Sequence, residues 1–332
     1  MTQPIRVFIN GFGRIGRSIM RQLWSEQPHP VFELVGINDV APLETCAYLL
    51  QYDSVFGRFP QNVETAMRSL IIGGRTLPFY QEADLRALDL SGVDVVLECT
   101  GLVKQRGFVE AGIAAGAANV LISGPSPVAD KTIVLGANED TLGAARVVSN
   151  ASCTTNAIAP LLRALDADFG VRQAHVTTIH CYTGSQPTVD QPGATFERSR
   201  AAAVSMVPTT TSAAHQIFEV LPAFDGRLSV AAVRVPTISV SAVDAVLQLA
   251  NVPEAPINER LRSVFAGSQL VQLFDDPCVS TDFRGCPASL SLSLRETQSV
   301  GSDQVRLFGW YDNEWGFSAR MLEMAERLAR RP

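Results

Sequence analysis

The fold of the N-terminal half is decided by one stretch, IRVFINGFGRIG at residues 5–16. Its first part is a run of β-branched and aromatic residues, which predicts a buried strand. The glycines are followed by apolar residues at helical spacing, so the stretch predicts strand, tight turn and helix. Gly11 suits the turn, Gly13 lets a pyrophosphate approach the backbone, and Gly16 allows helix and strand to pack closely. The stretch therefore predicts a dinucleotide-binding turn.

A second predicted strand, residues 32–37, ends at Asn38-Asp39. An acidic residue at this distance from the glycine turn accepts hydrogen bonds from ribose hydroxyls and repels a 2′-phosphate. Asp39 therefore favours NAD over NADP as the cofactor. The alternative is that Asp39 only caps the helix that follows.

Strands and helices continue to alternate through the first half. The predicted elements are strands at 93–97, 120–123 and 132–135 and a helix at 107–115. Apolar strands separated by helices are typical of a parallel sheet covered on both faces. We therefore expect an α/β Rossmann domain over residues 1–150. Ligands bind such sheets at the carboxyl ends of the strands, where Thr100-Gly101 and Ser123-Gly124 fall.

The second half has a different character. Several of its apolar runs alternate with polar residues, which predicts strands of a mixed or antiparallel sheet at 175–179, 228–235, 242–249, 289–294 and 305–311. We expect an α+β catalytic domain over residues 151–314. The C-terminal helix, within 315–332, is expected to pack back on the first domain. Residues 181–199 show little periodicity, and a loop this long is usually functional or part of an interface.

A thiol stands where an apolar strand gives way to a helix, in SNASCTTN at 149–156. At a helix N-terminus the unpaired N–H groups and the positive end of the dipole stabilise a thiolate. We therefore expect Cys153 to have a lowered pKa and to act as a nucleophile. The alternative is that Cys153 is one more buried small hydrophobe.

A cysteine nucleophile requires a base or an ion-pair partner. His180 closes a predicted strand and begins the long loop, so it is the best candidate among the four histidines. Arg198, Arg234 and the hydroxyl-rich run 209–212 supply cations and donors suited to anionic oxygens. Alternatively, each of these residues is an ordinary surface charge or helix cap.

Composition excludes several classes of protein. The formal net charge is -6 and there is no basic block, which argues against a nucleic-acid partner. The histidines show no metal-ligand spacing, so we expect no metal. No apolar run reaches the length of a membrane span or signal peptide, and the six cysteines form no C-x-x-C pair, so we expect a cytoplasmic protein with reduced thiols.

From residue 9 to residue 320 the chain resembles the phosphorylating glyceraldehyde-3-phosphate dehydrogenases. The shared motifs are INGFGRIGR at 9–17, SNASCTTN at 149–156, RAAA at 200–203, VPTTT at 207–211, RVPT at 234–237 and WYDNEWG at 310–316. The resemblance implies that Cys153 attacks the aldehyde carbon while His180 takes the proton. Hydride then passes to NAD, and inorganic phosphate releases the resulting thioester as an acyl phosphate.

The resemblance also assigns binding roles to individual residues. It implies that the residues binding NAD are Arg14, Ile15, Asp39 and Ser123, with Asn313 at the nicotinamide carboxamide. It implies that the residues binding phosphate are Ser152, Thr154, Arg198 and Thr211 on one side and Thr183 and Arg234 on the other. The family is a homotetramer, in which the 181–199 loop packs near a neighbour's cofactor.

Two departures from the family pattern fall near these phosphate subsites. Ser185 stands where the family usually has an acidic residue, and Ser212 stands where a glycine normally follows the threonine triplet. Because erythrose-4-phosphate dehydrogenases share most of the motifs, that aldehyde is the alternative substrate. A third reading, against which Cys153, His180 and Asn313 argue, is an inactive paralogue with a binding role.

Overall fold

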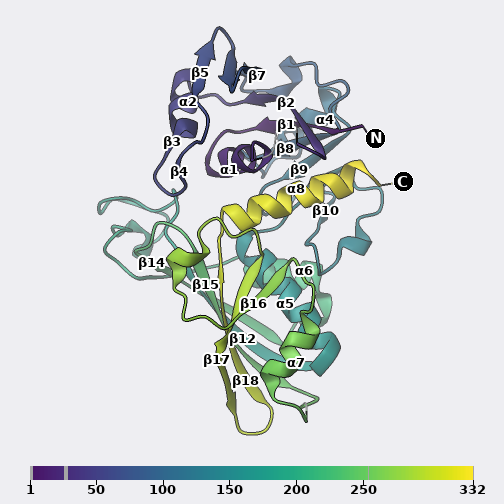
Figure 1. Cartoon of the computed structure of the whole chain (residues 1–332), viewed down its shortest axis with the longest axis vertical. Helices are drawn as coiled ribbons and strands as arrows, with labels where there is room; N and C mark the ends of the chain where they lie inside the picture. Colours follow the sequence, from purple (N-terminus) through teal and green to yellow (C-terminus); the bar gives the residue numbers. More distant parts are fainter. Residues whose placement is uncertain (1–2, 26–28, 253, 332) are drawn as a thin grey trace. The chain divides into compact units, whose positions relative to one another are not determined.

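The structure is a computed structural model that describes residues 3–25, 29–252 and 254–331. The chain divides into two compact units (Figure 1). The first comprises Met1–Ile133, Asp140–Ala151 and Ser318–Pro332, and the second comprises Val134–Glu139 and Ser152–Phe317. No helix in the described residues is long and apolar enough to cross a membrane.

The first unit is built on a mostly parallel sheet in the order β10-β11-β9-β8-β1-β2-β7-β6-β5. Its strands are β1 (Ile5–Asn10), β2 (Phe32–Asn38), β5 (Val63–Ala66), β6 (Ser69–Ile72), β7 (Arg75–Tyr80), β8 (Val95–Glu98), β9 (Asn119–Ile122), β10 (Lys131–Thr132) and β11 (Val147–Ser149). Its helices include α1 (Arg14–Leu23), α2 (Leu43–Gln51), α3 (Arg106–Val109) and α4 (Ala111–Ala114). The expected Rossmann architecture is confirmed.

The order of the strands explains where a ligand can enter. From β1 the chain adds β2 and β7 on one side and then returns to place β8 on the other side of β1. In such sheets the ligand crevice lies at this switch point, outside the carboxyl ends of the strands. The buried strands carry β-branched and aromatic residues such as Phe8, Val96 and Val120, which form the core against α3 and α4.

Two expectations for the first unit were incomplete, and one feature was not foreseen. The helix predicted over 107–115 is broken at Glu110 into α3 and α4, and the poor helix formers Gly107 and Gly112 lie in these two short segments. The strand predicted at 132–135 is only β10, because the chain turns at Gly136, which has φ +79°. The antiparallel ribbon β5-β6-β7 carried no clear sequence signal and was not foreseen.

The second unit is built on a mixed sheet in the order β13-β14-β12-β15-β18-β17-β16. The strands are β12 (Val171–Cys181), β13 (Val207–Thr209), β14 (Leu228–Val235), β15 (Ser241–Leu249), β16 (Val271–Phe274), β17 (Leu290–Val300) and β18 (Gln304–Tyr311). Helices α5 (Cys153–Phe169), α6 (Ala213–Val220) and α7 (Ile257–Val264) lie along one face of this sheet (Figure 1). The expected mixed sheet is confirmed.

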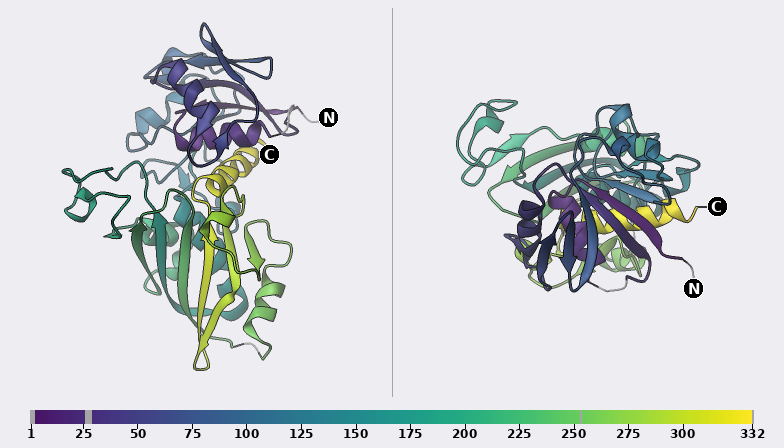
Figure 2. Two further views of the ribbon diagram at one scale, coloured as in Figure 1. Left: turned by 60° about the vertical axis from the view of Figure 1, so that its left-hand side comes forward. Right: turned by 90° about the horizontal axis from the view of Figure 1, so that it is seen from above.

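The segment between β12 and β13 extends away from this sheet (Figure 2). It exposes large apolar side chains to solvent, among them Val189, Phe196, Val204 and Met206. Phe196 is 93% exposed. Several exposed large apolar side chains in one extended segment are typical of a surface that binds another protein.

Candidate active site

Helix α5 begins at Cys153, as the sequence predicts. Ser152 is its N-cap, and the Ser152 hydroxyl accepts a hydrogen bond from the Thr155 N–H at 3.2 Å. The preceding Ala151 is fully buried and has φ +55°, which is a strained conformation for a residue with a Cβ. A strained turn thus sets the thiol into the first turn of the helix.

His180 approaches this thiol from the end of β12. Its Nε2 lies 3.5 Å from Cys153 Sγ, and its Nδ1 lies 2.7 Å from the main-chain oxygen of Cys181. When Nδ1–H donates to this carbonyl, Nε2 keeps its lone pair and can accept the thiol proton. The structure therefore brings the two predicted catalytic residues together in a geometry suited to proton transfer.

Arg234 is the neighbour of His180 across the parallel pair β12 and β14. Its NH1 lies 2.8 Å from the Cys181 oxygen and 2.7 Å from His180 Nδ1. The guanidinium can donate to Nδ1 only in the tautomer that has its proton on Nε2. The Cys181 carbonyl and Arg234 thus favour opposite tautomers of His180.

The expected lowering of the Cys153 pKa is not what the structure shows. Burial raises the pKa of this thiol, against the opposing effects of Thr154 and Arg234. Burial and then Arg234 lower the pKa of His180 to about 4. Desolvation disfavours an isolated thiolate and an isolated imidazolium alike. Thiolate and imidazolium are therefore expected to form together, when a proton moves from Sγ to Nε2.

A cavity of about 310 Å³ opens in front of this pair. The predicted residues that line it are Ser152, Cys153, Thr154, His180, Arg198, Thr211, Ser212 and Arg234. Thr183 is not part of this lining, and its hydroxyl pairs with that of Ser185 at 2.9 Å. Ser212 precedes α6 and its side chain does not cap that helix. Two arginines and several hydroxyls at one cavity suit phosphate oxygens.

Sequence reasoning missed the residues that hold this lining in place. The Tyr311 hydroxyl is fully buried and hydrogen-bonds to the hydroxyls of Thr154, at 2.9 Å, and Thr178, at 2.8 Å. Arg198 Nε donates to the Thr209 hydroxyl at 2.7 Å. Tyr311 lies inside a motif that was quoted for the resemblance, but only its tertiary contacts reveal this role.

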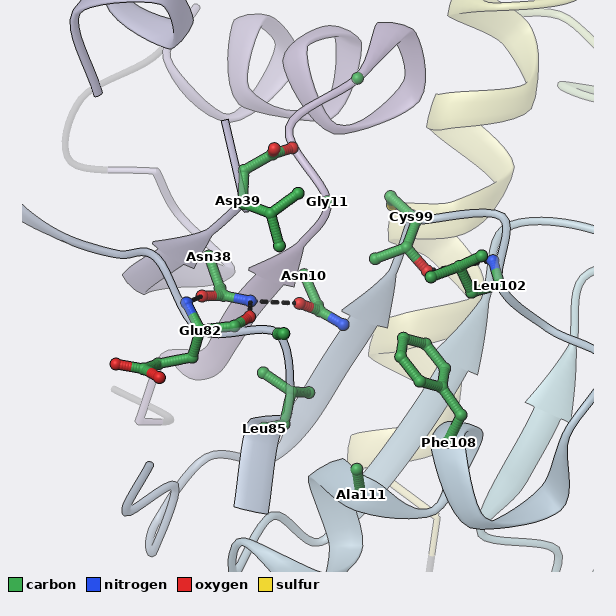
Figure 3. Close-up of a pocket in the computed structure, with 14 residues that line it drawn as sticks. Asn10, Gly11, Asn38, Asp39, Glu82, Leu85, Cys99, Leu102, Phe108 and Ala111 are labelled. Atoms are coloured by element: carbon green, nitrogen blue, oxygen red, sulfur yellow. Dashed lines mark hydrogen bonds between the residues drawn. The ribbon is translucent and has the colours of Figure 1, made fainter. Parts of the chain in front are cut away.

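The first unit contains a separate cavity of about 300 Å³ at its switch point (Figure 3). It is lined by residues that follow β1, β2 and β8, including Gly11, Gly13, Asp39 and Thr100. A Cβ on Gly11, which has φ +92°, would lie 2.6 Å from the main chain of Cys99 and Thr100. A Cβ on Gly16 would lie 2.2 Å from the Gly11 oxygen. The glycine turn is thus as tight as a dinucleotide site requires.

Asp39 faces this turn. Its Oδ2 accepts from the Phe12 N–H at 2.6 Å and its Oδ1 from the Ala41 N–H at 2.9 Å. Each oxygen retains a lone pair, so the carboxylate can also accept from ribose hydroxyls. The residues present therefore fit an adenosine dinucleotide.

A buried polar network adjoins the same cavity, and Figure 3 shows its Asn38–Asn10 part. Asn38 Nδ2 donates to Asn10 Oδ1 at 2.8 Å, and Asn10 Nδ2 donates to Glu98 Oε2 at 2.5 Å. Glu98 Oε1 accepts from the Thr100 N–H at 2.9 Å. Burial raises the pKa of Glu98. The network ties together the carboxyl ends of β1, β2 and β8.

The other predicted cofactor residues are placed as follows. Arg14 and Ile15 lie in the first turn of α1, whose N–H groups point out of the helix end and suit a pyrophosphate. The Arg14 side chain itself pairs with Asp53. Ser123 follows β9, and its N–H donates to the main-chain oxygen of Glu98 at 2.9 Å. Asn313 belongs to the second unit and follows β18.

Comparisons with known proteins assign both halves of the chain to one family. Residues 5–106 match the family described as "Glyceraldehyde 3-phosphate dehydrogenase, NAD binding domain", and residues 152–313 match "Glyceraldehyde 3-phosphate dehydrogenase, C-terminal domain". The chain is 42% identical to the glyceraldehyde-3-phosphate dehydrogenase of Xanthobacter flavus, over 98% of this chain and 99% of that protein. It is 41% identical to that of Cereibacter sphaeroides, with the same coverage, and 42% identical to that of Pseudomonas aeruginosa, over 98% of each. The chain therefore belongs to the family of NAD-dependent glyceraldehyde-3-phosphate dehydrogenases.

Proposed function

We propose that the chain oxidises glyceraldehyde 3-phosphate to 1,3-bisphosphoglycerate, using NAD and inorganic phosphate. The observation that supports this reaction most directly is the contact of 3.5 Å between Cys153 Sγ and His180 Nε2. Their cavity is also lined by two arginines, which suit the phosphate of an aldehyde substrate and a free phosphate ion. In this proposal residues 1–150 bind the cofactor, residues 151–314 carry the chemistry and the helix within 315–332 packs on the first domain.

The proposed reaction begins with Cys153. Its sulfur attacks the aldehyde carbon while His180 Nε2 accepts the thiol proton. His180 then passes this proton to the former carbonyl oxygen, so the product is a neutral thiohemiacetal and His180 is again a free base. When bound, NAD supplies the acceptor for the hydride that leaves this carbon, and His180 removes the hydroxyl proton. The resulting thioester stays on Cys153 until inorganic phosphate attacks it, releases the acyl phosphate and restores the thiolate. A covalent route divides one difficult oxidation into easier steps.

The two arginines divide the phosphate binding in this proposal. Arg234 and Thr183 hold the phosphate of the aldehyde, whereas Arg198, Ser152, Thr154 and Thr211 receive inorganic phosphate, with Ser212 as an added donor. Arg198 is held by Thr209 and by the Thr210 oxygen, which supports a fixed guanidinium. Asn313 holds the nicotinamide carboxamide.

The test is the production of NADH from glyceraldehyde 3-phosphate or erythrose 4-phosphate, each with and without phosphate. We expect steady turnover with glyceraldehyde 3-phosphate only when phosphate is present. Without phosphate, a burst of at most one NADH per Cys153 is expected because the thioester accumulates. Higher kcat/KM with erythrose 4-phosphate would reassign the substrate, and no NADH with either aldehyde would contradict the proposal.

We also propose a homotetramer in the cytoplasm. The exposed apolar residues of the segment between β12 and β13 support an interface with another subunit. All six cysteines are free thiols, a state that a reducing compartment maintains. Sedimentation equilibrium of the purified protein measures the subunit number directly.

Asp39 is expected to set the preference for NAD over NADP. Asp39→Gly should lower the ratio of kcat/KM for NAD to that for NADP by about tenfold or more, because it removes a carboxylate beside the site of the 2′-phosphate. Asp39→Asn is the matched control that removes charge and preserves shape, and it should lower the ratio as well. A native enzyme that reduces NADP as efficiently as NAD would show that Asp39 does not contact the ribose.

Arg234 is expected to be the main contact to the phosphate of the substrate. Arg234→Ala should lower kcat/KM for glyceraldehyde 3-phosphate by about 1.5–3 kcal/mol of transition-state binding, the scale of a hydrogen bond to a charged group. Because Arg234 also contacts His180, the same variant must be assayed with unphosphorylated glyceraldehyde. The loss should be clearly larger for the phosphorylated substrate, and equal losses would place the phosphate elsewhere.

A further inference from the structure

The side-chain amide of Asn313 is held from one side only. Asn313 is 7% exposed, and its Oδ1 accepts hydrogen bonds from the Cys181 thiol at 3.1 Å and from the Ser241 hydroxyl at 3.2 Å. The Ser241 oxygen in turn accepts from the main-chain N–H of Cys181 at 3.2 Å. Cys181 is therefore linked to Asn313 by two hydrogen-bond routes, directly through its thiol and indirectly through its main-chain N–H and Ser241.

These contacts determine which end of the amide is presented to a ligand. A carbonyl oxygen has two lone pairs, and both donors point at Oδ1. In the described part of the chain no residue accepts a hydrogen bond from Asn313 Nδ2. The amide thus has a saturated oxygen and an unused donor on a side chain that is more than nine-tenths buried.

Cys181 is suited to act as a permanent donor. It is 1% exposed, and burial raises the pKa of its thiol to about 12. The thiol therefore keeps its proton at any pH at which the enzyme would work. Cys153, in contrast, must lose its proton during turnover, so the two neighbouring cysteines have opposite requirements.

We propose that Cys181 is a positioning residue, whose thiol acts with Ser241 to turn Nδ2 of Asn313 toward the carboxamide oxygen of the nicotinamide. This inference rests on the proposed function, in which Asn313 contacts that carboxamide. Without the thiol, only one donor opposes a half-turn of the amide. The half-turn would present Oδ1 to the carboxamide oxygen, and two acceptors do not form a hydrogen bond.

The experiment compares Cys181→Ala with Cys181→Ser, two substitutions of nearly equal size that differ in one hydroxyl donor. The dissociation constants of NAD and of ADP-ribose, which lacks the nicotinamide, are measured by calorimetry. Cys181→Ala should raise the dissociation constant of NAD about five- to tenfold, the scale of one hydrogen bond, and should leave the dissociation constant of ADP-ribose unchanged. Cys181→Ser should restore most of the NAD affinity. Ser241→Ala should reproduce the loss by removing the second donor.

A second measurement separates positioning from general damage. Thionicotinamide adenine dinucleotide offers a sulfur in place of the carboxamide oxygen, and sulfur is a weaker hydrogen-bond acceptor. Native enzyme should therefore bind NAD more tightly than this analogue. In Cys181→Ala the ratio of the two dissociation constants should be closer to one. The inference would be overturned if the alanine and serine variants had the same dissociation constants for NAD and for the thio-analogue. It would also be overturned if Cys181→Ala lost as much affinity for ADP-ribose as for NAD. Because these are binding measurements, they remain decisive even if native enzyme oxidises neither aldehyde, a result that would contradict the proposed function instead.

Discussion

The Cys153→Ser enzyme is expected to fold, to bind NAD with native affinity and to lose nearly all turnover, with kcat reduced roughly 10³-fold or more. The exchange of sulfur for oxygen is small, so the start of α5 and the Ser152 cap should persist. A hydroxyl is a far poorer nucleophile because His180, with a pKa of about 4, is too weak a base to ionise it.

The measurement is steady-state NADH production together with an NAD titration of the same preparation. The thermal midpoint should stay within a few degrees of native, which separates lost chemistry from lost structure. Cys286→Ser provides a matched control, because Cys286 lies outside the cavity and contacts Ser291. If Cys153→Ser kept more than a small fraction of the native rate, the thiol could not be the nucleophile.

The His180→Asn enzyme should lose about 10²–10⁴-fold in kcat/KM, the contribution of general acid–base catalysis. His175→Asn is the matched control: His175 stands on the same strand but is exposed and pairs with the Ser229 hydroxyl at 2.7 Å, so its loss should not affect the rate. An unchanged rate in His180→Asn would mean that another group accepts the proton.

The pH dependence of Cys153 alkylation tests whether the thiol proton of Cys153 passes to the imidazole of His180. The rate at which the neutral reagent iodoacetamide alkylates Cys153 is proportional to the fraction of Cys153 present as thiolate. In the native enzyme His180 allows this thiolate to form by accepting its proton. Without His180 the proton must leave for solvent, and burial raises the pKa of this thiol above its ordinary value of 9.0. The alkylation midpoint should therefore move to higher pH in His180→Asn, and the rate at neutral pH should fall. Superimposable profiles would exclude a proton shared between the two residues.

Sequence patterns predicted the parts of the site that depend on residues close together in the chain. The glycine turn and the start of α5 at Cys153 each depend on residues adjacent in sequence. Arg234 and His180 were singled out by chemical need, and the structure places them side by side on neighbouring strands.

Contacts between distant residues could not be predicted in this way. Tyr311 meets Thr154 across 157 positions of sequence, and nothing near either residue signals the pair. The raised pKa of Cys153 has the same origin: the helix start is visible in the sequence, whereas the desolvation that outweighs it comes from the packed unit. The ribbon β5-β6-β7 was missed because β5 and β6 are only four residues long and three of the four residues of β5 are exposed, so neither strand shows a long apolar pattern.

The first unit combines segments from both ends of the described chain, and this affects the order in which its parts are synthesised. Its sheet is made by residues 5–149, yet Ser318–Pro332 belongs to the same unit. A ribosome makes the chain from the N-terminus, at about 5–20 residues per second. The sheet is thus available for pairing while most of the second unit is still being made, whereas Ser318–Pro332 can join the first unit only after that synthesis. A nascent chain that stops short of helix α8 (Trp315–Ala329) lacks the last segment of the first unit, so it exposes surface that chains containing this helix bury.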